Sequence, residues 1–201
     1  MRNLPYTPPK EEFKGTLTGG TGNLKDTINS NKVIKNLSIT NPYNTETEMY
    51  YGLFSKLSGT VSNINFDNCT INLLQDDSMV TKTSYVGFVA GISNGATITN
   101  IITSSTIGFG TIGVGKTYAG GIVGYGNGNI SYVANTGNIN GNADHNFTGL
   151  TLNAIYQIGG ILGGSSDNNL TLTNAINTGQ ISSPGTLSAF TSSSNIEISV
   201  E

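Results

Sequence analysis

One stretch of the chain matches a phosphate-binding loop at every specified position. Residues 110–117 read GTIGVGKT, and such a loop holds phosphates with the amides of a helix that follows it. Here the segment that follows, residues 118–124, reads YAGGIVG. This segment is too rich in glycine for a stable helix. We therefore predict a loop between strands and no nucleotide binding.

Titratable residues that could catalyse a reaction are few and scattered. The single histidine, His145, cannot build a zinc site of two histidines. Asp76 and Asp77 are weak candidates for a metal site, because calcium needs six to eight oxygen ligands. Asp67 would need a second carboxylate within roughly 5–10 Å to cleave a glycosidic bond. We predict that the protein is not an enzyme and has no cofactor; a polysaccharide-active enzyme is the less favoured alternative.

The tyrosines are the best candidates for ligand contacts. Tyr50, Tyr85 and Tyr118 each precede an aligned glycine by two residues, and Tyr156 stands near a fourth. Outward-facing rings would form a ladder for stacking on sugars or on a protein partner. Inward-facing rings would only close the core. The sequence leaves both possibilities open.

These residues belong to a block that recurs four times. The glycines Gly52, Gly87, Gly120 and Gly159 follow one another at intervals of 35, 33 and 39 residues, a period typical of stacked repeats. A second block follows each glycine, at residues 61–64, 98–101, 130–133 and 172–175, and a third ends at Ile71, Ile107, Ile139 and Ile181. We expect residues 34–39 to match the second block. The spacing of ten residues in the first unit, against nine elsewhere, predicts a bulge.

Short β-branched runs bounded by Gly, Asn and Ser predict strands. We therefore predict an all-β fold, a parallel β-helix or β-solenoid of about four to five turns built from 33–39-residue repeats; a β-sandwich is the alternative. Glycines should form the corners through positive φ angles; examples are Gly52, Gly91, Gly124, Gly137 and Gly179. Asn63, Asn100 and Asn174 should stack as an amide ladder. An ice-binding solenoid is disfavoured, because we expect no Thr-x-Thr rows in register.

The repeat block resembles a known family. Residues 50–54 (YYGLF) and 120–125 (GGIVGY), each followed by a block such as Val61-Ser62-Asn63, are similar to the GLUG-type repeat of bacterial surface proteins. The resemblance covers roughly residues 13–183, with an insert at residues 20–31 where the family has a short turn. It implies a segment of a large adhesin, or of the non-catalytic region of a secreted immunoglobulin A1 protease. Neither activity belongs to the repeat itself.

Composition agrees with an exported scaffold. Charged residues make up 10% of the chain, against about 25% in ordinary domains, and a net charge of −3 gives no basic surface for nucleic acid. We expect residues 1–12 to be a Pro-rich linker and residues 13–201 to be one domain. This domain has a partial unit at 13–49, units from about 50, 85, 118 and 157, and a cap at 184–201.

The expected function is adhesion at the cell surface or outside the cell, as part of a larger exported protein. The partner would be a host or neighbouring-cell surface protein or a glycan. We expect no binding of nucleic acid or nucleotide. Contact with a membrane is expected only through an anchor in the parent protein. The alternative is a stalk with no ligand of its own.

Overall fold

A computed structural model describes residues 4–20, 32–73, 82–109, 116–141, 155–165 and 169–182. Every regular element in these ranges is a β-strand, so the all-β prediction is confirmed for them. Several predicted features lie outside the described residues: Asp76, Asp77, Asp144, His145, Asp167, residues 110–115 of the phosphate-loop match and the cap at 184–201.

The strands form two sheets. The larger one is parallel throughout and contains twelve strands: β1 (Leu4–Pro5), β2 (Thr16–Thr18), β3 (Lys32–Lys35), β4 (Leu37–Ile39), β7 (Phe54–Leu57), β8 (Thr60–Leu73), β10 (Ala90–Phe109), β12 (Val123–Asn135), β13 (Ile139–Gly141), β15 (Leu162–Gly164), β16 (Leu170–Asn177) and β17 (Ile181–Ser182). The smaller one contains β5 (Tyr43–Asn44), β6 (Glu48–Tyr51), β9 (Thr83–Val86), β11 (Lys116–Gly120) and β14 (Ile155–Gly159). Only the pair β5–β6 is antiparallel.

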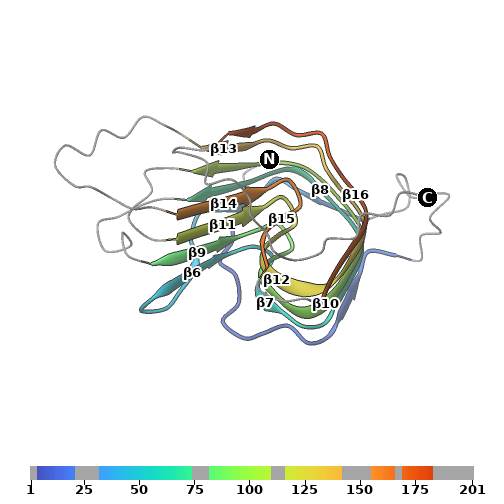
Figure 1. Cartoon of the computed structure of the whole chain (residues 1–201), viewed down its shortest axis with the longest axis horizontal. Coiled ribbons are helices and arrows are strands. Elements are labelled where there is room, and N and C mark those ends of the chain that lie inside the picture. Colours follow the sequence, from blue (N-terminus) through green and yellow to red (C-terminus); the bar gives the residue numbers. More distant parts are fainter. Residues whose placement is uncertain are drawn as a thin grey trace.

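The long strands lie one over another and bend at the same places (Figure 1). In the second block, Ile98 pairs with Val61 on one side and Ile130 on the other, and Ile130 pairs with Leu172. The third block is equally in step, with Ile107 between Ile71 and Ile139. The predicted in-step blocks are therefore confirmed as neighbouring strands, each pair separated by one repeat period.

The prediction for residues 34–39 is wrong. Ile34 pairs with Phe66, and Ile39 with Ile71, so this segment matches the end of β8 rather than the second block. The partner of Val61 is Leu17 in β2. The sequence IKNLSI therefore corresponds to FDNCTI at residues 66–71, and the insert separates β2 from β3, both of which pair with β8.

The corners are made by asparagine rather than by the predicted glycines. Asn36, Asn63, Asn68, Asn100, Tyr132 and Asn174 have φ between 49° and 58°, whereas Gly52, Gly91, Gly124, Gly137 and Gly179 are not among the described residues with positive φ. Asparagine tolerates this left-handed region because its short side chain bonds locally. The glycines serve close approach instead: a Cβ on Gly124 would lie 2.4 Å from the backbone nitrogen of Val86.

The predicted amide ladder forms where two asparagines are adjacent. The Asn100 Nδ2 donates to Asn63 Oδ1 at 2.7 Å. Two further columns follow the same pattern, with Asn68 Nδ2 donating to Asn36 Oδ1 at 2.7 Å and Asn135 Nδ2 to Asn177 Oδ1 at 2.8 Å. Tyr132 occupies the corner between Asn100 and Asn174, as the sequence indicated.

The core is a stack of aliphatic residues inside these bends. Val61, Ile98 and Ile130 are fully buried one above another, and Phe66 packs against Phe88 with ring centroids 5.8 Å apart. The predicted bulge lies at residues 68–69 of β8, where the pairing with β10 shifts between Ser104 and Thr106. Cys69 fills this position and is buried, as a small apolar residue would be.

Part of the segment predicted as a linker, from Leu4 to Pro9, contacts the strands. Leu4 and Pro5 pair with β4, and the Tyr6 hydroxyl donates to the Leu53 carbonyl at 2.7 Å. The Ser55 hydroxyl donates to the Pro9 carbonyl at 2.5 Å. Just beyond, Phe13 stacks on Phe54 with centroids 4.4 Å apart. This N-terminal segment covers one end of the strand stack, where edge groups would otherwise be open to other chains.

Candidate binding surfaces

Four tyrosines form a continuous ladder across the smaller sheet. Tyr43, Tyr50, Tyr85 and Tyr118 are paired in sequence through β5, β6, β9 and β11. Successive ring centroids lie 5.8, 5.5 and 5.5 Å apart, and the interplanar angles are 24°, 24° and 8°. The strand register therefore produces the ladder, because residues paired in neighbouring strands place their side chains side by side.

The rings of the ladder face one another. Tyr50 is fully buried, while Tyr85 and Tyr118 are half-buried. Tyr125 of β12 packs beside Tyr118, with centroids 4.6 Å apart. A flat sugar needs an open ring face for stacking, and neighbouring rings occupy the inner faces of this ladder. What the half-buried rings offer to solvent is mainly their edges.

Glu48 is the charged group of this surface. Its carboxylate accepts hydrogen bonds from the hydroxyls of Tyr50 and, at 3.4 Å, of Tyr85. Burial first, and then the Glu48 charge, raises the pKa of Tyr85 to about 12, and the same causes raise the pKa of Tyr50 further. Lys56 Nζ lies 5.0 Å from the centroid of the Tyr50 ring, a cation–π distance. The phenols therefore remain neutral hydrogen-bonding groups at ordinary pH.

Tyr156 and Tyr51, which stand near the aligned glycines in the sequence, are not part of the ladder's register. Gln157 pairs with Tyr118, so Tyr156 is one residue out of step and pairs with Thr117. Tyr156, which the sequence offered as a ligand-binding candidate together with Tyr50, Tyr85 and Tyr118, therefore does not occupy the ladder's register position. Tyr51 pairs with Val86 and is fully buried in the core.

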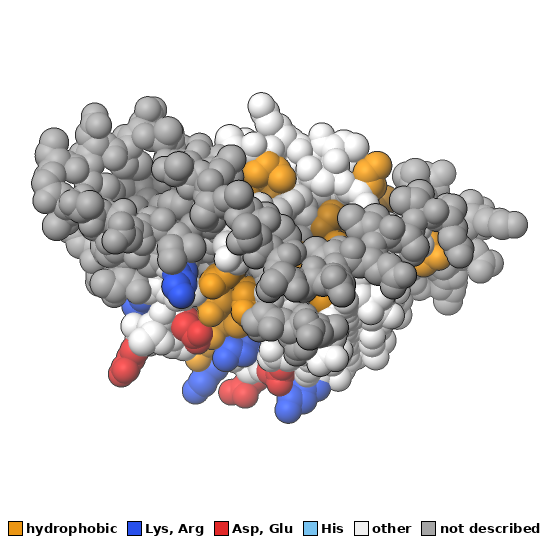
Figure 2. All heavy atoms as spheres, in the orientation of Figure 1, with side chains coloured by type: hydrophobic (Ala, Val, Ile, Leu, Met, Phe, Trp, Pro, Cys, Tyr) orange, Lys and Arg blue, Asp and Glu red, His pale blue; other side chains and the backbone are white. Residues whose placement is uncertain are grey.

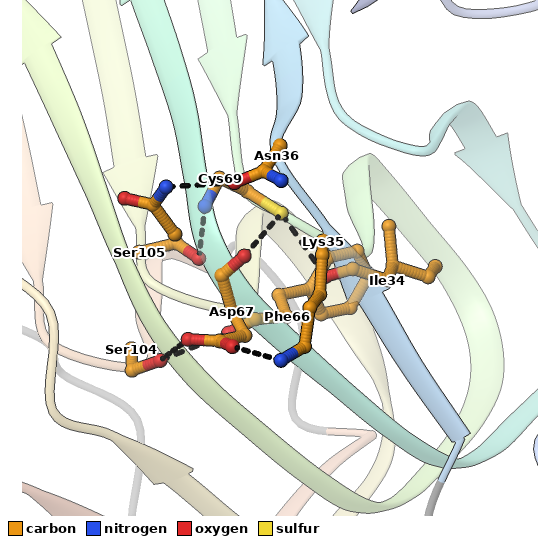
Figure 3. A network of polar contacts seen from close by, with 9 residues as sticks. Ile34, Lys35, Asn36, Phe66, Asp67, Cys69, Ser104 and Ser105 are labelled. Atoms are coloured by element: carbon orange, nitrogen blue, oxygen red, sulfur yellow. Dashed lines mark hydrogen bonds and ion pairs between the residues drawn. The ribbon is translucent and has the colours of Figure 1, made fainter. Parts of the chain in front are cut away.

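Asp67 lies in a network of polar contacts rather than beside a described carboxylate partner (Figure 3). Its carboxylate forms an ion pair with Lys35 at 3.1 Å and accepts a hydrogen bond from the Ser104 hydroxyl at 3.3 Å. Beside it, the Cys69 thiol donates to the Ile34 carbonyl at 3.3 Å, and the Cys69 amide donates to the Ser105 hydroxyl at 2.9 Å. These contacts hold the bulge of β8 against its neighbours.

Two further features concern metals and nucleotides. Among the described residues, no three of His, Cys, Asp and Glu are grouped closely enough to hold a metal ion. Lys116 and Thr117, the last two residues of the phosphate-loop match, lie in strand β11, whereas a phosphate loop leads into a helix. In the described ranges, no helix is long and apolar enough to cross a membrane.

A second regular surface was missed by the sequence prediction. Strict Thr-x-Thr triplets occur in β2, β10 and β16, and the strands between them carry Thr60-Val61-Ser62 and Asn129-Ile130-Ser131. Five strands place a polar-apolar-polar triplet in step, and the outward residues form two columns: Thr16, Thr60, Thr97, Asn129 and Thr171 in the first, and Thr18, Ser62, Thr99, Ser131 and Thr173 in the second. We call these ten residues the hydroxyl array. Each is exposed or half-buried.

The signal for the hydroxyl array was present in the sequence. Each triplet starts one residue before the aligned apolar residue of the second block, from Val61 to Leu172. The triplet in β2 was missed because residues 34–39, rather than the residues around Leu17, were predicted to match the second block. Ser62, Asn129 and Ser131 hid the pattern from a search for threonine alone.

Charged side chains gather elsewhere on the visible face. In Figure 2 the acidic and basic side chains lie together along the lower margin, and the remaining described surface is mostly uncharged. The ten residues of the hydroxyl array include no charged residue. The two regular surfaces are therefore the tyrosine ladder, which contains a carboxylate, and the hydroxyl array, which is neutral.

The fold and these surfaces define an all-β protein with a large parallel sheet and ladders of like side chains. No protein-family model matches the chain, and neither a curated protein nor a solved structure matches it. The function must therefore be inferred from the residues and their geometry.

Proposed function

We propose that the protein is a parallel β-solenoid segment of an exported bacterial surface protein, and that it presents a rigid surface for adhesion. The solenoid would have about four to five turns, built from repeats of 33–39 residues. The observation that supports it is the register: the same three blocks pair from strand to strand across β8, β10 and β12. The resemblance to GLUG-type repeats supports the exported location.

Rigidity is the property that this architecture supplies. Parallel backbone hydrogen bonds join neighbouring turns, and the amide column of Asn63 and Asn100 adds side-chain bonds between them. The Phe13–Phe54 stack and the Tyr6 hydroxyl close one end. Each turn contacts chiefly its neighbours, so further repeats of the same kind can lengthen such a stack in one direction.

The tyrosine ladder is the proposed adhesive surface. Tyr85 and Tyr118 are half-buried and lie in adjacent strands, so their exposed edges form a fixed row. Tyrosine combines a rigid apolar ring with a polar tip, which suits contact with proteins and with glycans. We propose edge-on hydrogen bonding to a host or neighbouring-cell surface protein or glycan, because the inner ring faces are occupied by stacking.

A glycan array and a panel of extracellular-matrix proteins test this function. Tyr85→Phe and Tyr118→Phe remove the hydroxyls and keep the stack, so binding should weaken by about tenfold, the equivalent of one or two hydrogen bonds. Tyr132→Phe is the matched control, since Tyr132 is 44% exposed and lies outside the ladder. Equal losses in all three variants, or no saturable binding by the folded wild type, would contradict the adhesive role.

A stalk is the second candidate, and one observation favours it. Tyr50 is fully buried and its neighbours are stacked, so the ladder also serves as packing between turns. A stalk would display another domain of the parent protein without binding a ligand. Absence of binding in the wild type, together with cooperative unfolding, would support this candidate.

A further inference from the structure

The hydroxyl array defined above repeats regularly across the sheet, and binding of a soluble partner does not require such a repeat. Its two columns run through five ranks of strands, β2, β8, β10, β12 and β16. Seven of its ten residues are threonine, two are serine and one is asparagine. We propose that this face binds an extended periodic surface of hydrogen-bonding groups, and specifically the surface of an ice crystal.

The spacing of the array is fixed in two directions by the backbone. Paired residues in neighbouring strands lie about 4.7–4.9 Å apart, and residues i and i+2 on one strand lie about 6.6–6.8 Å apart. Five ranks of two residues therefore make a near-rectangular lattice of side chains. Ice presents water oxygens at regular repeats of a similar scale, so bound waters can occupy both lattices at once.

The array is also stiff. Between its two columns lies an apolar column of Leu17, Val61, Ile98, Ile130 and Leu172, in the same register. Val61, Ile98 and Ile130 are fully buried, so they hold the outward residues at a constant height. Threonine has few χ1 rotamers because it is β-branched. Binding an ordered surface therefore costs little side-chain entropy.

The hydroxyls show the expected alignment across strands. Ser131 Oγ donates to Thr99 Oγ1 at 3.1 Å, which joins two ranks of the second column. The corner that follows is held by Asn63 and Asn100, whose amides are bonded at 2.7 Å. The array therefore ends at a defined edge along the strands, beyond which the chain turns away.

The chemistry of the array favours ice over other periodic surfaces. It contains hydroxyls, methyl groups and the single amide of Asn129, and no charge. Charged groups would hold their own hydration shells and disrupt an ordered water layer. Crystalline polysaccharide is also periodic, but recognition of sugars draws on aromatic platforms. The array has no aromatic residue. Tyr132 lies at the neighbouring corner rather than in either column.

The inference goes beyond the adhesive function and does not depend on it. The tyrosine ladder lies on the smaller sheet, whereas the hydroxyl array lies on the larger one. Substitutions in one surface therefore leave the other intact. Loss of ice binding and loss of binding to a protein or glycan can be measured separately in the same molecule.

Ice-affinity partitioning of the fluorescently labelled chain tests the inference. A slowly growing ice front should incorporate the wild-type protein and exclude a non-binding reference protein. Thr97→Lys places a charge in the middle rank and should lower the ice-bound fraction by about tenfold. Thr106→Lys is the matched control, because Thr106 lies on the same strand β10, beyond the Asn100 corner, and is outside the array.

The outcomes separate cleanly when both variants unfold at the wild-type temperature. Incorporation of wild type and Thr106→Lys, with exclusion of Thr97→Lys, supports the inference. Exclusion of the wild type from ice overturns it, and so does equal loss in both variants. Crystalline cellulose and chitin form a parallel arm: binding there that depends on Thr97, without incorporation into ice, assigns the array to a polysaccharide and also overturns it.

Discussion

Substitution of Gly124 by alanine tests why glycine recurs in the repeat block. The added Cβ would lie 2.4 Å from the Val86 nitrogen and 2.6 Å from the Gly91 oxygen. Both atoms are backbone, so neither can rotate away as a side chain would. Because β9 and β10 are each hydrogen-bonded to neighbouring strands, relief of the overlap requires a shift of whole strands. We expect a large loss of stability.

The magnitude follows from the cost of overpacking a rigid interior. Such substitutions cost about 1–3 kcal/mol, and a backbone contact belongs at the upper end. A loss of about 3 kcal/mol corresponds to a fall in Tm of roughly 6–12 °C for a protein of this size. Denaturant unfolding followed by circular dichroism measures the free energy, and calorimetry measures Tm.

Gly95 supplies the matched control. Its φ is +73° and nothing lies within 4 Å of an added Cβ. A substitution at Gly95 therefore tests the backbone conformation without causing a steric overlap. Gly95→Asn should be nearly neutral, because asparagine already occupies the left-handed corners of this chain. If Gly124→Ala unfolds at the wild-type temperature, or if Gly95→Asn is the more damaging of the two, the close-approach argument is refuted.

Two further predictions concern the asparagine corners and the tyrosine ladder. Asn100→Ala should lower the free energy of unfolding by about 2 kcal/mol, because alanine disfavours positive φ and leaves Asn63 Oδ1 without its donor. Asn100→Gly removes the same hydrogen bond but adopts positive φ freely, so it should lower the free energy of unfolding by about half as much. Denaturant titration measures both values. For Tyr85, the folded pKa of about 12 exceeds the unfolded value of 10, so its contribution to stability is complete below pH 10 and is lost as pH rises toward 12. Glu48→Gln should lower the pKa of Tyr85 but leave it above 10, since burial remains; ultraviolet titration of tyrosinate checks this, with Glu46→Gln as the control, and an unchanged titration would contradict the assigned cause.

The strand register could be predicted where the spacing between blocks was constant. Ile98 to Ile107 and Ile130 to Ile139 span the same nine residues, so both ends of each segment stay in step. The prediction failed for Ile34, because an apolar residue followed two positions later by Asn occurs in two blocks of the repeat. Only the pairing of Ile34 with Phe66 shows which of the two blocks residues 34–39 match. The insert before Ile34 changes its distance from the preceding strand, so the spacing between blocks could not identify the match.

The candidate surfaces were predicted less well than the strands. The ladder positions of Tyr50, Tyr85 and Tyr118 follow from their offset to the aligned glycine, and that part of the prediction holds. Which faces of the rings are open could not be predicted, because it depends on the rotamers of neighbouring tyrosines and on Tyr125, which lies in β12 of the larger sheet. The step of one residue at Gln157 follows from the same offset, because Tyr156 precedes Gly159 by three residues rather than two.

Glycine and asparagine divide two tasks that the sequence seemed to give to glycine alone. Where two backbones touch, as at Gly124, only a residue without Cβ fits, and φ is ordinary. At the corners, as at Asn63 and Asn100, φ is positive. Glycine would satisfy that corner, but it would leave no amide to bond the next turn. Asparagine costs some backbone strain there and returns a hydrogen bond between turns. The hydrogen bond between Asn100 and Asn63 joins β10 to β8, two of the strands whose register aligns the hydroxyl array.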